Sequence, residues 1–297
     1  MKLAVAKYRI GAPADFDAFA ARQRGSILDA ARAGAQWVVL PEYLSLELAA
    51  AFDATVQGDL HASLAATQLH ADAFVALFAA LAREAGVVVQ AGTFLTAVNG
   101  RYRNRAWWFA PDGRHGFQDK LQLTAFEKQA GVIEAGDALR VFDAGLRAGI
   151  AVCYDVEFPL SVRAQAEAGA RLIVVPSCTD TAAGATRVRV GCLARALENR
   201  VFVAQAVTAG TAPWSPALDV NTGEATIYAP MDRGLPDDGI VATTRGDDAW
   251  AIAELDVEAL EVSRAQAQVA NDRDWVGQGR PGVVRARVDG GVAGLGV

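Results

Sequence analysis

The sequence of 297 residues predicts an α/β protein. Short apolar runs typical of strands recur along the chain, and stretches with helical spacing lie between them. Glycine or proline separates most of these segments. Strands that alternate with helices in this way build sheets whose faces are covered by helices. Apolar residues make up 52% of the chain, which is enough to bury a sizeable core.

The first elements end at glycine or proline. A strand around Leu3 and Val5 is followed by a helix that Asp15 caps and that ends near Ala33 at Gly34. The next buried strand and the next clear helix also end at a proline and a glycine. They are the apolar run Trp37 to Leu40, ended by Pro41, and a helix with i, i+3, i+4, i+7 spacing at Phe74, Leu77, Phe78 and Leu81, which Gly86 closes.

A long irregular segment divides the middle of the chain. Strands are expected from Val87 and from Arg105 to Phe109, the second turned by the Pro-Asp-Gly at 111–113. Residues 119–138 have no strong period and predict a long loop with short helical pieces. A loop of this length inside a compact domain is usually functional.

The second half of the chain repeats the strand and helix alternation. A hairpin is expected from Val141 to Asp143 and from Arg147 to Val152, and its second strand leads directly to Cys153. The later elements are a helix from Arg163 to Ala168 stopped by Gly169, a strand from Leu172 to Val175 ended by Pro176, a helix from Val188 to Asn199, and strands at Val201 to Val207, Ala225 to Tyr228 and Trp250 to Leu255.

No linker or internal repeat interrupts this pattern, so residues 1–275 are predicted to form a single domain. The tail at 276–297 mixes glycine, arginine and valine without a period, and we expect it to lie over a neighbouring subunit or to fray. Its segment Gly277 to Gly282 matches G-x-G-x-x-G formally. Because no clear strand precedes it and it contains proline, it does not predict a dinucleotide site.

Composition excludes several classes of protein. The formal charge of −6, from 28 basic and 34 acidic residues, argues against nucleic acid as a partner, which needs a basic face. Three cysteines give no disulfide framework and fit a reducing compartment. Charged residues interrupt the N-terminus before a signal-peptide core, and no apolar run approaches the roughly 20 residues that span a bilayer. We expect a soluble, cytoplasmic protein without a membrane partner.

Three separate segments carry side chains suited to catalysis. Cys153 lies between an apolar strand and a helix start near Phe158, where a nucleophile is exposed beside backbone N–H groups, although an isolated cysteine is more often structural. Glu42 leaves the carboxyl end of a buried strand, where α/β proteins build sites. Lys120 ends a short strand-like piece, and Glu127 follows seven residues later.

Histidine offers no catalytic base. The chain has only His61, His70 and His115, and none lies in a recognisable catalytic setting, so a Cys–His protease is disfavoured. A carboxylate must then activate Cys153, and the candidates are Glu42 and Glu127. Among the other cysteines, Cys178 ends a strand and is expected to line a cleft, whereas Cys192 lies on a helical face and is expected in the core.

Four blocks together resemble the nitrilase (carbon–nitrogen hydrolase) superfamily, in its order and over residues 1 to about 275. They are Leu40-Pro41-Glu42-Tyr43, Asp119-Lys120-Leu121-Gln122-Leu123 with Glu127, Cys153-Tyr154-Asp155-Val156-Glu157-Phe158-Pro159, and Arg195-Ala196-Leu197-Glu198-Asn199-Arg200. The resemblance implies a four-layer αββα sandwich, two sheets face to face with helices outside. It also implies a homodimer or higher homo-oligomer, and a reaction that needs no metal or organic cofactor.

The resemblance assigns roles by position. Glu42 becomes the general base, Lys120 the oxyanion stabiliser, Cys153 the nucleophile and Glu127 an assistant. The backbone N–H of Tyr154 is expected to share the oxyanion, and Lys120 is expected to favour the thiolate. Pocket walls are expected after Tyr43, around Thr124 to Lys128, and from Ser177 through Cys178 and Thr179 to Thr181, with Arg187 and Arg189 more often surface residues than carboxylate ligands.

The residues after Cys153 narrow the predicted reaction. Nitrile hydrolysers of this superfamily usually have Trp-Glu there, whereas Tyr154-Asp155 resembles the amidase branches, in particular a poorly characterised group that is sometimes fused to an N-acetyltransferase domain. The predicted function is hydrolysis of an amide or carbamoyl C–N bond of a small molecule through a thioester on Cys153. Nitrile hydrolysis, acyl transfer to an amine and an inactive binding protein are the alternatives.

Overall fold

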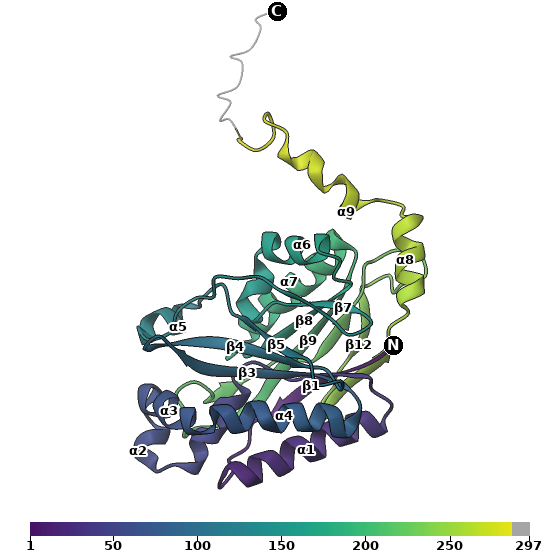
Figure 1. Ribbon diagram of the computed structural model, residues 1–297. Helices are drawn as coiled ribbons and strands as arrows, with labels where there is room; N and C mark the ends of the chain where they lie inside the picture. Colours follow the sequence, from purple (N-terminus) through teal and green to yellow (C-terminus); the bar gives the residue numbers. More distant parts are fainter. Residues whose placement is uncertain (287–297) are drawn as a thin grey trace, which may run out of the picture.

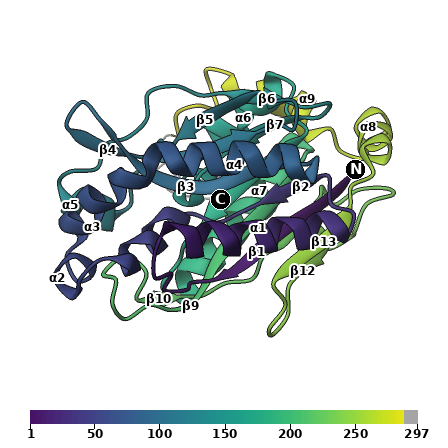
Figure 2. The ribbon, with the colours of Figure 1, turned by 60° about the horizontal axis from the view of Figure 1, so that its bottom comes forward.

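Two sheets packed face to face form the centre of the computed structural model, which describes residues 1–286 (Figure 1). Helices α1 (Phe16–Arg32) and α4 (Ala71–Ala85) lie side by side over the outer face of one sheet, as Figure 2 shows. Helices α6 (Pro159–Glu167) and α7 (Ala182–Asn199) cover the other. The four-layer αββα sandwich that the resemblance implied is therefore confirmed.

Strand β1 (Lys2–Arg9) belongs to both sheets. Its first half, Leu3 to Val5, pairs in parallel with β2, and its last residues, Lys7 to Arg9, pair in parallel with β9. The first sheet adds β13 (Trp250–Glu254), β2 (Trp37–Val39), β3 (Val88–Val98), β4 (Arg101–Phe109) and β5 (His115–Asp119). The second adds β9 (Phe202–Thr211), β8 (Leu172–Ser177), β7 (Arg147–Ile150), β6 (Val141–Asp143), β11 (Thr226–Tyr228) and β12 (Ile240–Thr243).

Alternate residues of β1 point into two different cores. Leu3 and Val5 lie in the core between the sheets, together with Trp37. Ala4 and Ala6 lie in the core under the helices, which α1 and α4 fill with aromatic side chains such as Phe74. Because both faces of these strands are covered by apolar layers, each strand is a nearly continuous apolar run in the sequence.

Most predicted boundaries agree with the structure because they depend on local capping chemistry. The side chain of Asp15 accepts a hydrogen bond from the backbone N–H of Ala18 at 2.7 Å and begins α1. Gly86, with φ +67°, ends α4, whose Phe74, Phe78 and Leu81 are buried as the spacing predicted. The hairpin of β6 and β7 and the strand β13 also lie where the sequence placed them.

Several predicted boundaries are wrong. Strand β4 begins at Arg101 rather than at Arg105, and α6 begins at Pro159 rather than at Arg163. Strand β8 continues through Pro176 to Ser177, because β7 pairs only with Leu172 to Val174. With no ladder partner on that side at Pro176, the missing N–H costs no hydrogen bond. Helix α7 begins at Ala182 rather than at Val188, since the Thr181 hydroxyl accepts a hydrogen bond from a first-turn N–H and caps it.

Several short elements were not predicted, because two to nine residues show little periodicity. They are α2 (Ala54–Gln57), α3 (Leu60–Thr67), α8 (Val257–Ala265), α9 (Asn271–Asp274), β10 (Val220–Asn221), β12 and the 3-10 turns η1 (Leu44–Ala51), η2 (Gln68–His70) and η4 (Trp275–Gly279). The G-x-G-x-x-G segment overlaps η4 and follows no strand. Residues 287–297 of the predicted tail lie outside the described residues, and the single domain over 1–275 stays a prediction.

The stretch Leu60–Ala85 corrects the expectation that no segment reaches membrane-spanning length. Within the described residues, it is the one helical stretch that is long and apolar enough to cross a membrane, judged by length and composition alone. Its mean hydropathy is 1.5. It is divided into α3, η2 and α4, and α4 buries its aromatic face against the first sheet. The apolar residues of α4 therefore have a packing role in the sandwich.

Candidate active site

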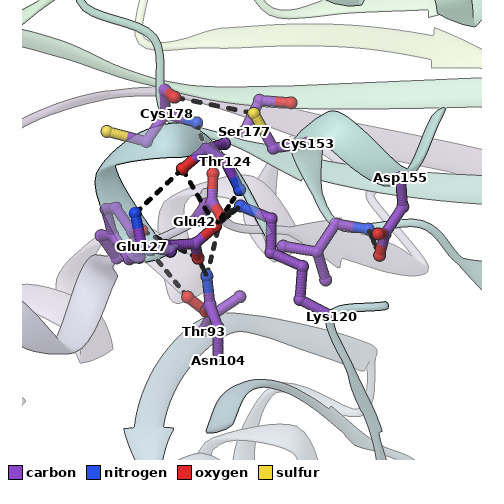
Figure 3. Close-up of polar contacts among 12 residues, drawn as sticks. Glu42, Thr93, Asn104, Lys120, Thr124, Glu127, Cys153, Asp155, Ser177 and Cys178 are labelled. Carbon is purple, nitrogen blue, oxygen red and sulfur yellow. Dashed lines mark hydrogen bonds and ion pairs between the residues drawn. The ribbon is translucent and has the colours of Figure 1, made fainter. Parts of the chain in front are cut away.

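The structure brings Glu42, Lys120 and Cys153 together from three segments (Figure 3). Glu42 follows β2, Lys120 follows β5, and Cys153 begins the 3-10 turn η3 (Cys153–Glu157) after β7. Their exposed fractions are 1%, 1% and 4%, and all three line one cavity of about 350 Å³. Small-molecule sites have volumes of this order.

The Glu42 carboxylate is held by donors on both oxygens. Its Oε1 accepts hydrogen bonds from Lys120 Nζ and from Asn104 Nδ2, both at 2.8 Å. Its Oε2 accepts one from the backbone N–H of Cys178 at 3.1 Å. The Cys153 thiol lies beside this group and donates to the Cys178 carbonyl at 3.6 Å. The segment after β8 thus orients both the carboxylate and the thiol.

Lys120 lies between two carboxylates. Its Nζ is 2.8 Å from Glu42 Oε1 and 2.8 Å from Glu127 Oε2. Glu127 is fully buried on α5 (Ala125–Ala130), where Thr124 and Glu127 form a capping box. Its Oε1 accepts from Tyr43 Oη at 3.0 Å and from Asn104 Nδ2 at 3.1 Å. One amide group, that of Asn104, therefore bridges the two carboxylates.

The turn that carries Cys153 has an unusual backbone. Cys153 has φ +48°, a left-handed conformation that non-glycine residues rarely adopt and that is concentrated at functional sites. The Asp155 carboxylate accepts N–H groups from Val152 at 3.1 Å, Leu121 at 3.1 Å and Gln122 at 2.6 Å. It joins the cysteine turn to the lysine loop, and burial raises the pKa of Asp155 to about 7.

A glycine in β3 supports the turn that carries Glu42. Gly92 has φ +61° at a bulge in the pairing of β3 with β4, and a Cβ there would lie 2.3 Å from the Pro41 carbonyl oxygen. The next residue, Thr93, accepts the backbone N–H of Tyr43 at 2.8 Å through its hydroxyl. Tyr43 itself has φ +61°.

Burial and charge shift the titration of the cluster in different directions. Burial raises the pKa of Glu42 above the ordinary glutamate value, and this outweighs the nearby Lys120 ammonium. For Glu127 burial also opposes ionisation, but Lys120 and its hydrogen bonds outweigh it and lower the pKa. For Lys120 burial opposes the charge, yet the two carboxylates hold its pKa well above the ordinary value.

Opposing effects set the pKa of Cys153. Burial raises this pKa well above the usual thiol value, and the Glu42 carboxylate raises it further. Lys120 acts in the expected direction and lowers it, but its effect is smaller than that of burial. Lys120 therefore favours the thiolate as predicted, while burial and the Glu42 carboxylate together hold the pKa of Cys153 above the usual thiol value.

Most of the predicted pocket residues face this cavity. Tyr43, Tyr154, Cys178 and Thr179 line it, together with the segment from Thr124 to Phe126. The structure does not place Ser177 on the cavity. Because β8 extends to this residue, its side chain is fully buried in the sheet and its hydroxyl donates to the Val175 carbonyl at 3.3 Å.

Other residues of the site carried no signal that the sequence reasoning used. Asn104 lies between two arginines on β4, and only its buried position in the sheet distinguishes it. Arg187 does line the cavity, whereas Arg189 lines a separate one. The remaining walls are Glu157, Asp180, Gly184, Val188, Pro216, Ala217, Asp219 and Val220. The last four come from a segment in which sequence reasoning placed no element.

The chain is similar to known hydrolases in sequence. Residues 2–261 match the family model described as Carbon-nitrogen hydrolase. The probable hydrolase YhcX of Bacillus subtilis is 30% identical over 278 residues, which cover 92% of this chain and 53% of YhcX, so the chain spans about half the length of that relative. The omega-amidase NIT2-A of Xenopus laevis is 26% identical over 256 residues, 83% of this chain and 86% of that protein.

A solved structure supports the fold independently. The crystal structure of Saccharomyces cerevisiae Nit3, a member of branch 10 of the nitrilase superfamily, superimposes with a TM-score of 0.72 at 21% sequence identity. The match covers 92% of this chain and 96% of Nit3. At this level of identity the likeness concerns the fold.

Proposed function

The chain belongs to the carbon–nitrogen hydrolase family, and we propose that it hydrolyses the C–N bond of a small-molecule amide through a thioester on Cys153. One observation carries the proposal. The Cys153 thiol, the Glu42 carboxylate and the Lys120 ammonium meet in one buried cavity that is large enough for a small molecule. The omega-amidase name of the relative NIT2-A supports an amide as the substrate.

In the first step Glu42 takes the thiol proton while Cys153 Sγ attacks the carbonyl carbon of the amide. The electron pair of the C=O π bond moves to the oxygen. Lys120 Nζ and the backbone N–H of Tyr154 donate hydrogen bonds to this oxyanion, because the first N–H groups of η3 have no partner within the turn. Removing one such donor typically costs about 2.7–4 kcal/mol of barrier.

The protonated Glu42 then donates to the leaving nitrogen. The C–N bond breaks, the amine or ammonia departs, and the acyl group remains on Cys153 as a thioester. Glu42, again a carboxylate, removes a proton from water as that water attacks the thioester carbonyl. The C–S bond breaks, the acid is released, and Glu42 returns its proton to the sulfur. Each proton moves through one carboxylate.

Glu127 serves this cycle through Lys120. It supplies the second negative charge beside the ammonium, and its own lowered pKa keeps that charge present when Glu42 is protonated. The Tyr154-Asp155 pair after the nucleophile supports amides over nitriles. A cytoplasmic location and a homo-oligomeric state stay predictions.

A release assay tests the function. Ammonia and amine release is measured across ω-amides, N-carbamoyl compounds, short acyl amides and the matching nitriles, with wild type, Cys153→Ala and Cys178→Ala. We expect amides to be turned over by wild type and by Cys178→Ala, and an acyl adduct on Cys153 in intact-protein mass spectra. Turnover by Cys153→Ala at the wild-type rate would rule out the mechanism, and faster nitrile hydrolysis would reverse the choice of substrate.

A further inference from the structure

The outer part of the active-site cavity is lined by carboxylates from three separate segments. Glu157 ends η3, Asp180 precedes α7, and Asp219 precedes β10. They share the cavity with Cys153, so they face any substrate whose carbonyl reaches the nucleophile.

The cationic side chains of the cavity are already balanced. Lys120 lies between Glu42 and Glu127, both at 2.8 Å. Arg187 reaches the outer wall, and its Nε is 3.8 Å from Glu157 Oε1. Among residues 1–286, Asp180 and Asp219 have no cationic side chain within 4.0 Å. These two carboxylates therefore give the outer cavity an excess of negative charge.

The excess negative charge and the reacting groups differ in their exposure to solvent. Lys120 is buried beside Glu42, whereas the Asp180 and Asp219 residues of the lining are exposed to solvent. A cleft lined by one sign of charge concentrates ligands of the opposite sign, and its low-dielectric walls strengthen the effect. A second carboxylate on the substrate would meet this excess charge, and the one arginine among the lining residues, Arg187, already lies 3.8 Å from Glu157.

We propose that the substrate is an amide that carries a cationic group, such as an ammonium, at the end remote from the scissile carbonyl. Asp180 and Asp219 select this group. The inference rests on the proposed function and adds the substrate class. It distinguishes this chain from an enzyme for amides whose remote end is a carboxylate.

Two matched series of amides test the selection. The first is δ-aminovaleramide, valeramide and glutaric acid monoamide, which share chain length and release ammonia. The second places the charge on the amine side, with N-acetylputrescine, N-butylacetamide and N-acetyl-γ-aminobutyrate. In at least one series we expect kcat/KM to be highest for the ammonium member, by about tenfold over the neutral one, since each partly exposed ion pair contributes a few-fold. A neutral or carboxylate member that is best in both series overturns the proposal.

Variants show whether the two carboxylates cause the preference. Asp180→Asn and Asp219→Asn are each expected to lower the ammonium-to-neutral ratio about two- to fivefold, and the double variant to lower it further. Asp17→Asn, which removes one exposed charge from α1 on the opposite helical layer, is the matched control and leaves the ratio unchanged. A ratio that stays at the wild-type value in the double variant contradicts the assignment.

A measurement that needs no hydrolysis separates failure of this inference from failure of the proposed function. In the Cys178→Ala background, Cys153 is modified by methanethiosulfonates that carry either a trimethylammonium or a sulfonate group, and each rate is divided by that of a small thiol. We expect the cationic reagent to be favoured about tenfold, and less so after Asp180→Asn. An equal or reversed preference overturns the charge selection whether or not any amide is cleaved.

Discussion

The Glu127→Gln substitution separates two roles of one side chain. Glu127 occupies the N3 position of the capping box of α5, with Thr124 at the N-cap. It is also the second counter-ion of Lys120. Glutamine at this capping position keeps the hydrogen bond to the Thr124 N–H, whereas the negative charge is lost. A loss of activity in this variant that exceeds the loss in a variant of the cap alone therefore reports on the charge beside Lys120.

The size of the effect follows from the donors around the carboxylate. Oε1 accepts from Tyr43 Oη and Asn104 Nδ2, and Oε2 accepts from Lys120 Nζ and from the N–H and hydroxyl of Thr124. A glutamine NH₂ group must replace one oxygen, and it then faces two donors at the Oε1 position or three at the Oε2 position. Its least unfavourable place is Oε1, since the Tyr43 hydroxyl can turn to accept, but the Asn104 amide then opposes another N–H group.

We expect Glu127→Gln to lose about 3 kcal/mol of stability, because it removes one partner of a buried ion pair and leaves donors unsatisfied. We expect kcat/KM to fall about a hundredfold or more, the range for one impaired oxyanion donor. The assays are steady-state ammonia release and thermal unfolding. Thr124→Ala is the control, since it removes the cap hydroxyl at about 1 kcal/mol and keeps the charge. If Glu127→Gln loses stability as Thr124→Ala does but keeps wild-type kcat/KM, Glu127 is only a cap.

Two further predictions concern pH and the backbone. Because Glu42 must be ionised to act as base and its pKa is raised, we expect kcat/KM to rise with pH through an acid limb above the ordinary glutamate pKa of about 4.3. Because the pKa of Cys153 is also raised, no alkaline decline is expected near the ordinary thiol value of about 8.5, and a decline there in the pH profile would contradict the assignment. Gly92→Ala should destabilise by several kcal/mol in chemical unfolding, since its Cβ meets the Pro41 carbonyl, whereas Gly86→Ala, with a similar φ of +67° and open space, should cost about 1–2 kcal/mol; equal losses would show that the contact at Gly92 is not limiting.

The α/β class and most element ends could be predicted from the sequence, because capping and spacing act over a few residues. The packing of the two sheets could not be derived from the same residues. A run such as Trp37 to Leu40 is apolar whether its strand lies between two helical layers or between a helix layer and a second sheet. Only the resemblance of four separate blocks to a known superfamily supplied that choice.

The site shows the same limit at the level of single residues. Glu42 and Cys153 stand directly after strands, so their position at a sheet edge could be predicted. Asn104 reaches both carboxylates only through the register of β4 between β3 and β5, which no local pattern specifies. The sequence predicts a strand end at Pro176 and a pocket wall from Ser177, but β8 includes both residues, and the Ser177 side chain is buried rather than facing the cavity.

The raised pKa values of Cys153 and Glu42 are consistent with catalysis once the charge of the whole cluster is considered. Lys120 with Glu42 and Glu127 carries one net negative charge in a buried setting, and a free Cys153 thiolate would add a second. If the proton passes to Glu42 during attack, the negative charge instead reaches the oxyanion beside Lys120, and the cluster keeps its net charge through the step. A base with a raised pKa is also a stronger proton acceptor. The raised thiol pKa then keeps the resting cysteine protonated, and it does not slow a reaction in which no free thiolate forms.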